Sequence, residues 1–239
     1  MIRLTHGMVL AAGLGTRMRP LTDATPKPLL RLRGRSLLDH ALDRLDEAGI
    51  GTAVVNAHHL ADQVVAACAD RPGTTVIVED ELLETGGGML NALPRLGDGP
   101  FAAVNGDAYW LDGPTPALLR LAAAFDPAAM DALLLLVRAA AVEGDIGAGD
   151  FLLDPLGRIR RPKEREIAPY VYAGVGIVAP SLLAGYAPGR FGLMGPWTRA
   201  MEAGRLYGLV HDGAWFHLST PADLPRAERA LDSGLVKLF

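Results

Sequence analysis

The sequence predicts a three-layer α/β fold around a mainly parallel, mixed central sheet. Short apolar runs alternate with segments of helical period along most of the 239 residues, which is typical of strands joined by covering helices. Half of the residues are apolar and 21% are charged, a balance typical of a globular protein. The length is sufficient for one sizeable core. We therefore expect a single domain over residues 1–239.

The strands of the first half are expected where apolar runs are short and bounded by turn residues. Their expected ranges are 8–12, 52–57, 75–79, 101–105 and 132–137. Helices are expected between them. The first begins after an N-cap at Ser36 and ends before Gly49. The others run through Cys68, from about Met89 and over residues 115–125.

The alternation of apolar runs and segments of helical period changes beyond residue 140. A hairpin is expected over residues 151–160, because Asp154-Pro-Leu-Gly157 is a turn signal between two short apolar runs. Further strands are expected at 170–178, 206–210 and 215–218. Pro221 is expected in the first turn of a final helix.

Charge, cysteine content and hydropathy exclude several classes of partner. The net charge of −4 gives no general reason to expect nucleic acid or an anionic membrane. The basic cluster at residues 158–165 is expected to be a solvated hairpin or a site for one small anion. The longest apolar run, residues 132–137, is too short to span a membrane, and residues 1–7 lack the apolar segment of a signal peptide. The single cysteine, Cys68, is expected to be an inert core thiol. We therefore expect a cytoplasmic protein with small-molecule partners, and no feature sets the oligomeric state.

A glycine-rich segment, LAAGLGTRMRP, follows the first expected strand at residues 10–20. Gly13 and Gly15 allow a tight turn that brings bare backbone close to a phosphate, and the N–H groups of such a turn form an anion-binding nest. Arg17 adds a fixed charge that can bind two phosphate oxygens at once. Lys27 lies between two prolines that stiffen its backbone. The spacing fits neither a dinucleotide fingerprint nor a Walker A loop. The alternative is a plain tight turn.

A carboxylate, Asp107, follows the expected strand at 101–105 after one glycine. Ligands of open α/β sheets bind at the carboxyl ends of strands. An oxygen ligand at this point suits Mg²⁺, which takes one or two carboxylates together with substrate phosphates. The alternative is a turn aspartate that accepts hydrogen bonds from local N–H groups.

The segments LAAGLGTRMRPLT and TPKPLL together resemble the signature of the sugar-1-phosphate nucleotidyltransferases. The resemblance implies a Rossmann-like nucleotidyltransferase fold, in which residues 1–139 bind mainly the nucleotide and residues 140–239 mainly the sugar phosphate. It implies a catalytic set of Arg17 on the NTP phosphates, Lys27 on the reacting phosphate and Asp107 on Mg²⁺. The nucleotide-binding residues that it implies are Ala11, Ala12, Gly13, Gly15, Thr16, Arg17, Glu84 and Gly86.

A second metal-binding aspartate of that family lies in a W-x-D-x-G-T segment, from which this chain departs. The chain has WFHLST at residues 215–220, so His217 stands in place of the aspartate and Ser219 in place of the glycine. Neutral imidazole is a poor ligand for Mg²⁺. Three alternatives stay open: the metal relies on Asp107 and the phosphates, His217 acts on it through a bound water, or the protein binds nucleotide without turnover.

Substrate selection is expected to involve the segment LETGGG at residues 83–88, placed before a helix. Its three glycines are expected to leave bare backbone for a base or a sugar. LETGGG and VNGD resemble the branch of the family that acts on N-acetylmuramate 1-phosphate in cell-wall sugar recycling. The resemblance implies that Glu84 and Gly86 contact the base or sugar. The implied sugar-phosphate-binding residues are Asn105, Arg161 and Gly174.

The function that the resemblance implies is transfer of a nucleotidyl group, from UTP, to N-acetylmuramic acid 1-phosphate with release of pyrophosphate. Related alternatives use mannose 1-phosphate with GTP, or glucose 1-phosphate with UTP or dTTP. An alternative of another class is a nucleotide-binding regulatory protein without turnover, which the unusual His217 keeps open.

Overall fold

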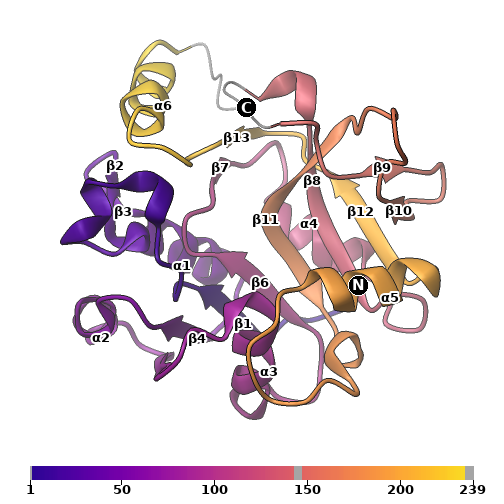
Figure 1. Ribbon diagram of the computed structural model, residues 1–239, viewed down its shortest axis with the longest axis horizontal. Helices are drawn as coiled ribbons and strands as arrows, with labels where there is room; N and C mark the ends of the chain where they lie inside the picture. The colour runs from indigo at the N-terminus through magenta and orange to yellow at the C-terminus, as the bar shows by residue number, and fades with distance from the viewer. Residues whose placement is uncertain (1, 143–146, 235–239) are drawn as a thin grey trace.

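A seven-stranded mixed sheet forms the centre of the molecule in the computed structural model, which describes residues 2–142 and 147–234 (Figure 1). The strand order is β12-β8-β11-β6-β1-β4-β5, and β11 is the strand that runs antiparallel to its neighbours. The strands are β1 (His6–Leu10), β4 (Thr52–Ala57), β5 (Thr74–Val78), β6 (Phe101–Asn105), β8 (Ala132–Arg138), β11 (Tyr170–Val178) and β12 (Leu206–Val210). The predicted fold class is confirmed.

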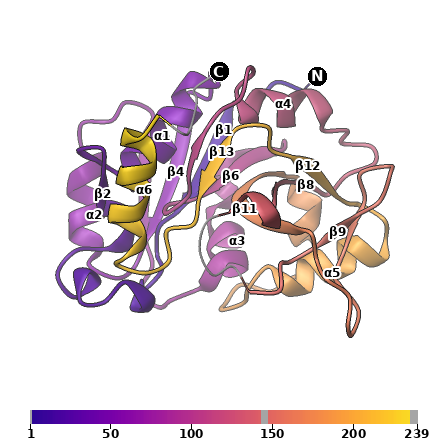
Figure 2. The ribbon, with the colours of Figure 1, turned by 90° about the horizontal axis from the view of Figure 1, so that it is seen from above.

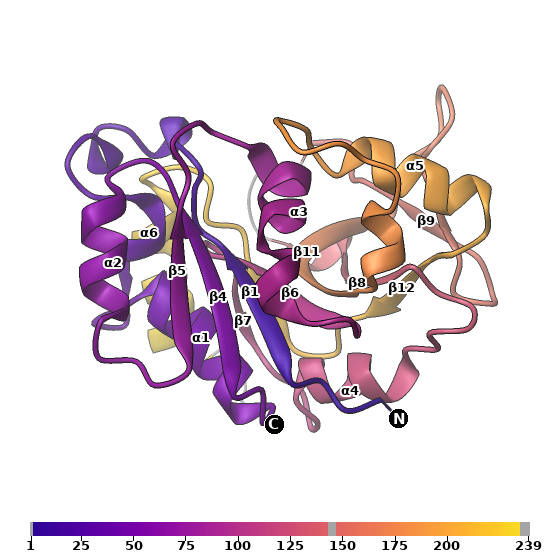
Figure 3. The ribbon, with the colours of Figure 1, turned by 90° about the horizontal axis from the view of Figure 1, so that it is seen from below.

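Helices cover both faces of this sheet and give the fold its three layers (Figures 2 and 3). The helices α1 (Leu37–Glu47), α2 (Ala61–Cys68) and α4 (Ala117–Ala124) pack on one face, and α3 (Glu84–Leu96) and α5 (Met194–Glu202) pack on the other. Successive side chains of β1 point to opposite faces of the sheet. Met8 packs in the core on the side of α3 and α5, and Val9 packs in the core on the side of α1, α2 and α4. No helix in the described ranges is long and apolar enough to cross a membrane.

Three parallel strands end level with one another where polar side chains gather. In the register of the sheet, Leu10 at the end of β1 lies opposite Asn56 of β4 and Asn105 of β6. The glycine-rich loop that follows β1 and the turn that carries Asp107 therefore leave the sheet side by side. This edge of the sheet is where ligands of such folds bind.

A small two-stranded ribbon joins the middle of the chain to its C-terminal part. The strand β7 (Tyr109–Leu111) pairs antiparallel with β13 (Ala214–Phe216), and Trp110 lies opposite Trp215. Trp110 is buried in the core and donates from Nε1 to Asp112 Oδ1 at 2.9 Å. The ribbon carries the segment after β13 back toward Asp107. The last helix, α6 (Asp223–Asp232), packs on a third apolar cluster that includes Met18 and Leu218.

Several element boundaries differ from those expected. The segment LETGGG does not precede α3 but forms its first turns, because α3 begins at Glu84. Pro221 precedes α6 by two residues and is not in its first turn. The helix α5 was not expected, because a glycine and a proline interrupt its apolar pattern. The proline lies in its first turn, where it costs no helical hydrogen bond. The hairpin was predicted correctly, with strands β9 (Leu152–Leu153) and β10 (Ile159–Arg160).

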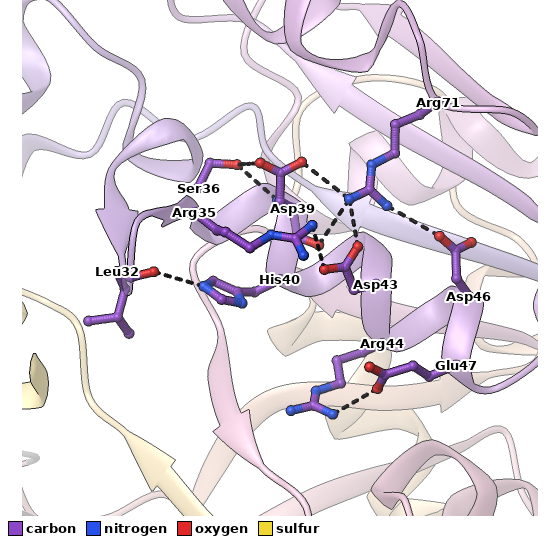
Figure 4. A network of polar contacts seen from close by, with 10 residues as sticks. All are labelled: Leu32, Arg35, Ser36, Asp39, His40, Asp43, Arg44, Asp46, Glu47 and Arg71. Carbon is purple, nitrogen blue, oxygen red and sulfur yellow. Dashed lines mark hydrogen bonds and ion pairs between the residues drawn. The ribbon is translucent and has the colours of Figure 1, made fainter. Parts of the chain in front are cut away.

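Charged side chains of α1 are held by one arginine on the outer face of that helix (Figure 4). Ser36 is the N-cap, as expected, since its hydroxyl accepts from the backbone N–H of Asp39 at 3.0 Å. Arg71, which follows α2, donates to Asp43 at 2.6 Å and to Asp39 and Asp46 at 3.2 Å. This arginine therefore ties α1 to the loop that leads into β5.

Candidate active site

The loop after β1 is shaped by contacts with its neighbours in the sheet. The backbone N–H of Ala11 donates to Asn56 Oδ1 at 2.9 Å, which explains why β1 ends at Leu10 and not two residues later. Gly15 adopts a left-handed φ of 61°, and a Cβ there would lie 3.0 Å from both Thr22 and Lys27. The Thr22 hydroxyl donates to the Gly15 carbonyl at 2.9 Å. The short helix η1 (Thr16–Met18) follows and presents Arg17 at the surface.

Lys27 and Asp107 form an ion pair at the edge of the sheet. Lys27 Nζ donates to Asp107 Oδ2 at 2.5 Å, and the exposed fractions of the two side chains are 11% and 36%. Lys27 begins the short helix η3 (Lys27–Leu29), directly after Pro26, and most of its side chain is buried. An ammonium group has three donor hydrogens, so the bond to Asp107 leaves two for other acceptors.

Two cavities adjoin at this ion pair. The first has a volume of about 300 Å³ and is lined by the glycine-rich loop, by Asn56 and by the start of α3. The second has a volume of about 280 Å³ and is lined by β11 and by the segment after β13. The residues that line both are Arg17, Lys27, Asn105, Asp107 and Ser219. Two ligands, one in each cavity, would therefore meet beside the same two cationic side chains.

The first cavity includes most of the residues expected to bind nucleotide. Those that line it are Ala11, Ala12, Gly13, Gly15, Thr16, Arg17 and Glu84. Glu84 has a left-handed φ of 62°, and its carboxylate accepts from Arg190 Nε at 2.8 Å. Gly86 lines neither cavity.

The three glycines of LETGGG are in contact with the protein itself. A Cβ on Gly86 would lie 2.5 Å from the ring of Phe191, one on Gly87 would lie 2.1 Å from the carbonyl oxygen of Gly189, and one on Gly88 would lie 2.7 Å from Asn56 Nδ2. The expectation that these glycines leave bare backbone for a base or sugar is therefore wrong. They allow the segment before α5 and the polar group under the loop to pack closely on α3.

A buried polar pair under the first cavity was missed in the sequence. Asn56 Nδ2 donates to Glu79 Oε1 at 2.7 Å, and Glu79 Oε2 accepts from the backbone N–H of Leu83 at 3.2 Å. Because Asn56 also accepts from Ala11, the pair joins the glycine-rich loop to the start of α3. Its two members are separated by 23 residues, so no local motif could reveal it.

The second cavity contains two of the three residues expected to bind the sugar phosphate. Gly174 has a left-handed φ of 77°, and a Cβ there would lie 2.9 Å from Asn105 Nδ2. The register of β11 shifts between Tyr172 and Gly176, so the strand bends over Asn105 at this point. Asp150 also lines this cavity and accepts from the Tyr172 backbone N–H at 2.9 Å. Burial raises the pKa of the Tyr172 hydroxyl well above its usual value.

Arg161, the third such residue, lines neither cavity. Its guanidinium lies 5.8 Å from the centre of the Phe151 ring and 3.8 Å from Met194 Sδ. The neighbouring Arg160 is paired with Glu166, and this hydrogen bond lowers the pKa of the Glu166 carboxyl to about 2. The basic cluster around β10 is thus a solvated hairpin with an internal ion pair.

His217 lines the second cavity close to the ion pair. Burial lowers the pKa of His217 below its usual value, the positive charges of Arg17 and Lys27 act in the same direction, and the carboxylates of Asp223 and Asp107 oppose them. The imidazole is therefore neutral at pH 7. Among the described residues, no group of three or more His, Cys, Asp or Glu side chains is placed to hold a metal ion.

The nearby carboxylates of Asp212 and Asp223 have structural partners. Asp212 Oδ1 lies 2.7 Å from Arg120 Nη1. Asp223 Oδ2 accepts from the backbone N–H groups of Ser219 at 2.9 Å and Thr220 at 2.6 Å. Asp223 therefore fixes the turn between β13 and α6.

Two adjoining cavities that share the same cationic side chains can hold a nucleotide and a second phosphate compound, which is the arrangement that nucleotidyl transfer requires. The model of the MobA-like NTP transferase domain matches residues 7–143. Together with two relatives that match nearly the whole chain, this match shows that the chain belongs to the sugar-1-phosphate nucleotidyltransferases of that family.

Two relatives match nearly the whole chain. The N-acetylmuramate alpha-1-phosphate uridylyltransferase of Caulobacter vibrioides is 42% identical over 231 residues, which cover 94% of this chain and 96% of the relative. The enzyme of the same name from Neisseria meningitidis serogroup B is 37% identical over 227 residues, which cover 92% of this chain and 96% of the relative.

Solved structures support the fold at low sequence identity. HddC of Yersinia pseudotuberculosis, solved with GMP-PN, has a TM-score of 0.76 at 20% identity, with 95% of this chain and 100% of that chain covered. The inositol-1-phosphate CTP transferase of T. maritima has a TM-score of 0.74 at 19% identity, with 98% of each chain covered.

Proposed function

We propose that the protein transfers a uridylyl group from UTP to N-acetylmuramate alpha-1-phosphate and releases pyrophosphate. The choice of substrates rests on the two relatives of that name, which match over more than nine tenths of this chain. The structural observation that carries the proposal is the shared boundary of the two cavities. A reaction between two phosphate compounds requires both of them to reach the same cationic groups.

In the proposed reaction, an oxygen of the sugar phosphate attacks the α-phosphorus of UTP in line. The bond from that phosphorus to the oxygen of the leaving pyrophosphate breaks as the new bond forms. Such a transfer needs positioning and charge neutralisation, and it needs no protein nucleophile. The first cavity is proposed to hold UTP and the second to hold the sugar phosphate. By this division, residues 1–139 bind mainly nucleotide and residues 140–239 contribute mainly to the sugar side.

Arg17 and Lys27 are proposed to neutralise charge on the phosphates. The Arg17 guanidinium is exposed at the boundary of both cavities and is proposed to bind the pyrophosphate as it leaves. Lys27 is proposed to donate its two remaining hydrogens to the α-phosphate and to the attacking phosphate. Its bond to Asp107 and its burial hold the ammonium in one place, which reduces the cost of reorganisation during the reaction.

Asp107 is proposed to hold a Mg²⁺ ion together with the substrate phosphates. A single half-exposed carboxylate at the boundary of two cavities proposed to hold phosphate compounds fits the way Mg²⁺ is held, by one or two carboxylates and phosphate oxygens. A bound Mg²⁺ supplies charge neutralisation on the phosphates. His217 is proposed to contribute through a bound water, because its neutral imidazole is a poor direct ligand. A cytoplasmic location, expected from the sequence, stays a prediction.

A substrate matrix tests this function. Pyrophosphate release is measured with UTP, dTTP or GTP against the 1-phosphates of N-acetylmuramic acid, glucose and mannose, with MgCl₂ or with EDTA. We expect the highest kcat/KM for UTP with N-acetylmuramic acid 1-phosphate, and loss of activity in EDTA. No turnover with any pair would overturn the proposal, and a preference for GTP with mannose 1-phosphate would assign another branch of the family.

The metal assignment is tested by Asp107→Ala. We expect its rate to fall about a hundredfold or more. The matched control is Asp62→Ala, an exposed aspartate in the first turn of α2, which should keep the wild-type rate. Near-normal activity of the Asp107 variant would remove the carboxylate from the mechanism.

A further inference from the structure

Ser219 is a buried residue whose hydroxyl has no partner. It lies between β13 and α6, and 5% of its surface is exposed. Its Oγ is inaccessible to solvent and makes no hydrogen bond within residues 2–142 and 147–234. A buried hydroxyl without a partner destabilises the folded protein, so such groups in native proteins call for an explanation.

The backbone of Ser219 is firmly held although its side chain is not. Its N–H donates to Asp223 Oδ2 at 2.9 Å, and the same oxygen accepts from the Thr220 hydroxyl at 2.9 Å. On the other side, Leu218 packs in the apolar cluster that contains Met18. The backbone of Ser219 is therefore fixed in position, while no hydrogen bond restrains rotation of the hydroxyl about the Cα–Cβ bond. A serine hydroxyl has three staggered positions about this bond.

Ser219 also lines both cavities, together with Arg17, Lys27, Asn105 and Asp107. Two cationic groups and an amide around one point match the needs of a tetrahedral anion with several acceptor oxygens, and the Ser219 hydroxyl can join them by rotation. Rotation of the hydroxyl toward the cavities breaks no existing hydrogen bond. A phosphate oxygen at the boundary would supply the partner that the protein does not.

We propose that the Ser219 hydroxyl donates a hydrogen bond to a phosphate oxygen at the boundary of the two cavities, and that Ser219 is a substrate-binding residue of the transfer. The proposal rests on the proposed function, because that function brings phosphates to this point. The phosphate is either the α-phosphate of the nucleotide or the phosphate of the sugar. Both have the same acceptor chemistry, and the test distinguishes them.

The test compares Ser219→Ala and Ser219→Gly with the wild type in uridylyl transfer. A hydrogen bond to a charged group typically corresponds to a ten- to hundredfold effect, so we expect kcat/KM to fall by about that factor in both variants. The melting temperature of Ser219→Ala should equal or exceed that of the wild type, because the variant removes a buried hydroxyl without a partner. The matched control is Ser181→Ala, whose exposed hydroxyl bonds to Asp131 at 2.7 Å and should not affect activity.

Calorimetry with UTP alone identifies the phosphate. Weaker UTP binding by Ser219→Ala assigns the nucleotide, whereas unchanged UTP binding with a higher KM for the sugar phosphate assigns the sugar. Unchanged kcat/KM in Ser219→Ala, or a loss confined to Ser219→Gly, would overturn the proposal. A loss of activity matched by a lower melting temperature would show a structural role and would also overturn it. Inactivity of the wild type, in contrast, would count against the proposed function itself.

Discussion

At the scale of single residues, His217 occupies the position where the resembled family motif has a carboxylate. Its pKa is lowered by burial and by two nearby cationic side chains. A neutral imidazole adds no negative charge beside Asp107, so the proposed Mg²⁺ would have a single protein carboxylate as ligand. This difference predicts a weak affinity for Mg²⁺, which one substitution can strengthen.

We expect His217→Asp to lower the Mg²⁺ concentration needed for half-maximal activity, because a second carboxylate adds a hard oxygen ligand beside Asp107. The measurement is a titration of activity with MgCl₂ at saturating substrates. His217→Asn, which is polar but uncharged, is the control and should keep the wild-type requirement. The same Mg²⁺ dependence in both variants would show that position 217 does not face the metal.

The sequence predicted residues with local motifs and missed those defined by distant contacts. Arg17, Lys27 and Asp107 lie in short recognisable segments, and the structure brings them to one place. Asn56 lies in β4 and Glu79 directly follows β5, in segments that look like ordinary core, and their role depends on a contact between neighbouring strands. Such contacts between separate strands leave no local periodicity in the sequence.

At the scale of elements, the expected helix boundaries were wrong where the helices contain glycine and proline. The glycines of LETGGG suggested a loop, yet they lie in a helix whose neighbours approach too closely for any side chain. Helix propensity alone disfavours such a segment, and tertiary contacts outweigh it. The strands, in contrast, were predicted closely, because buried parallel strands have continuous apolar runs.

We expect Arg71→Met to lower the free energy of unfolding by about 1–2 kcal/mol, since it leaves three carboxylates of α1 close together without their cation. The pKa of Asp39 supports this: burial acts to raise it, but the Ser36 hydrogen bond and the Arg71 charge lower it overall. Urea denaturation measures the change, and the slope of the free energy of unfolding against urea concentration should be the same for the variant and the wild type. Arg19→Met is the control, as its ion pair with Asp23 is well exposed and its loss should change stability by less than about 0.5 kcal/mol. Equal effects of the two substitutions would contradict this account.

At the scale of the whole molecule, a buried histidine between β12 and β13, His211, couples stability to pH. His211 Nε2 lies 3.1 Å from the Leu111 carbonyl oxygen and 3.3 Å from that of Ala214. Burial lowers its pKa below the usual 6.5, and those two carbonyls partly oppose the shift. The unfolded chain therefore takes up a proton at a higher pH than the folded protein does.

The contribution of His211 to the free energy of unfolding should therefore be fully present above pH 6.5. It should be lost as the pH falls below that value. Thermal or urea unfolding between pH 7.5 and 5.5 measures the effect, in a range above the usual pKa of carboxylates. His211→Gln keeps a donor for the two carbonyls and should flatten the dependence. Parallel curves for variant and wild type would assign the dependence to another group.

The ribbon of β7 and β13 has a further consequence for how the protein is made. Ribosomes synthesise the glycine-rich loop first and the turn containing Ser219 nearly last, but both line the same two cavities. Contacts between distant parts of a chain form late in folding, because closing a long loop costs entropy before the contact compensates for it. A nascent chain can thus form its first parallel strands while it is still on the ribosome. Catalytic competence must wait until the C-terminal segment has returned to the first strands, so enzyme activity reports the completion of folding.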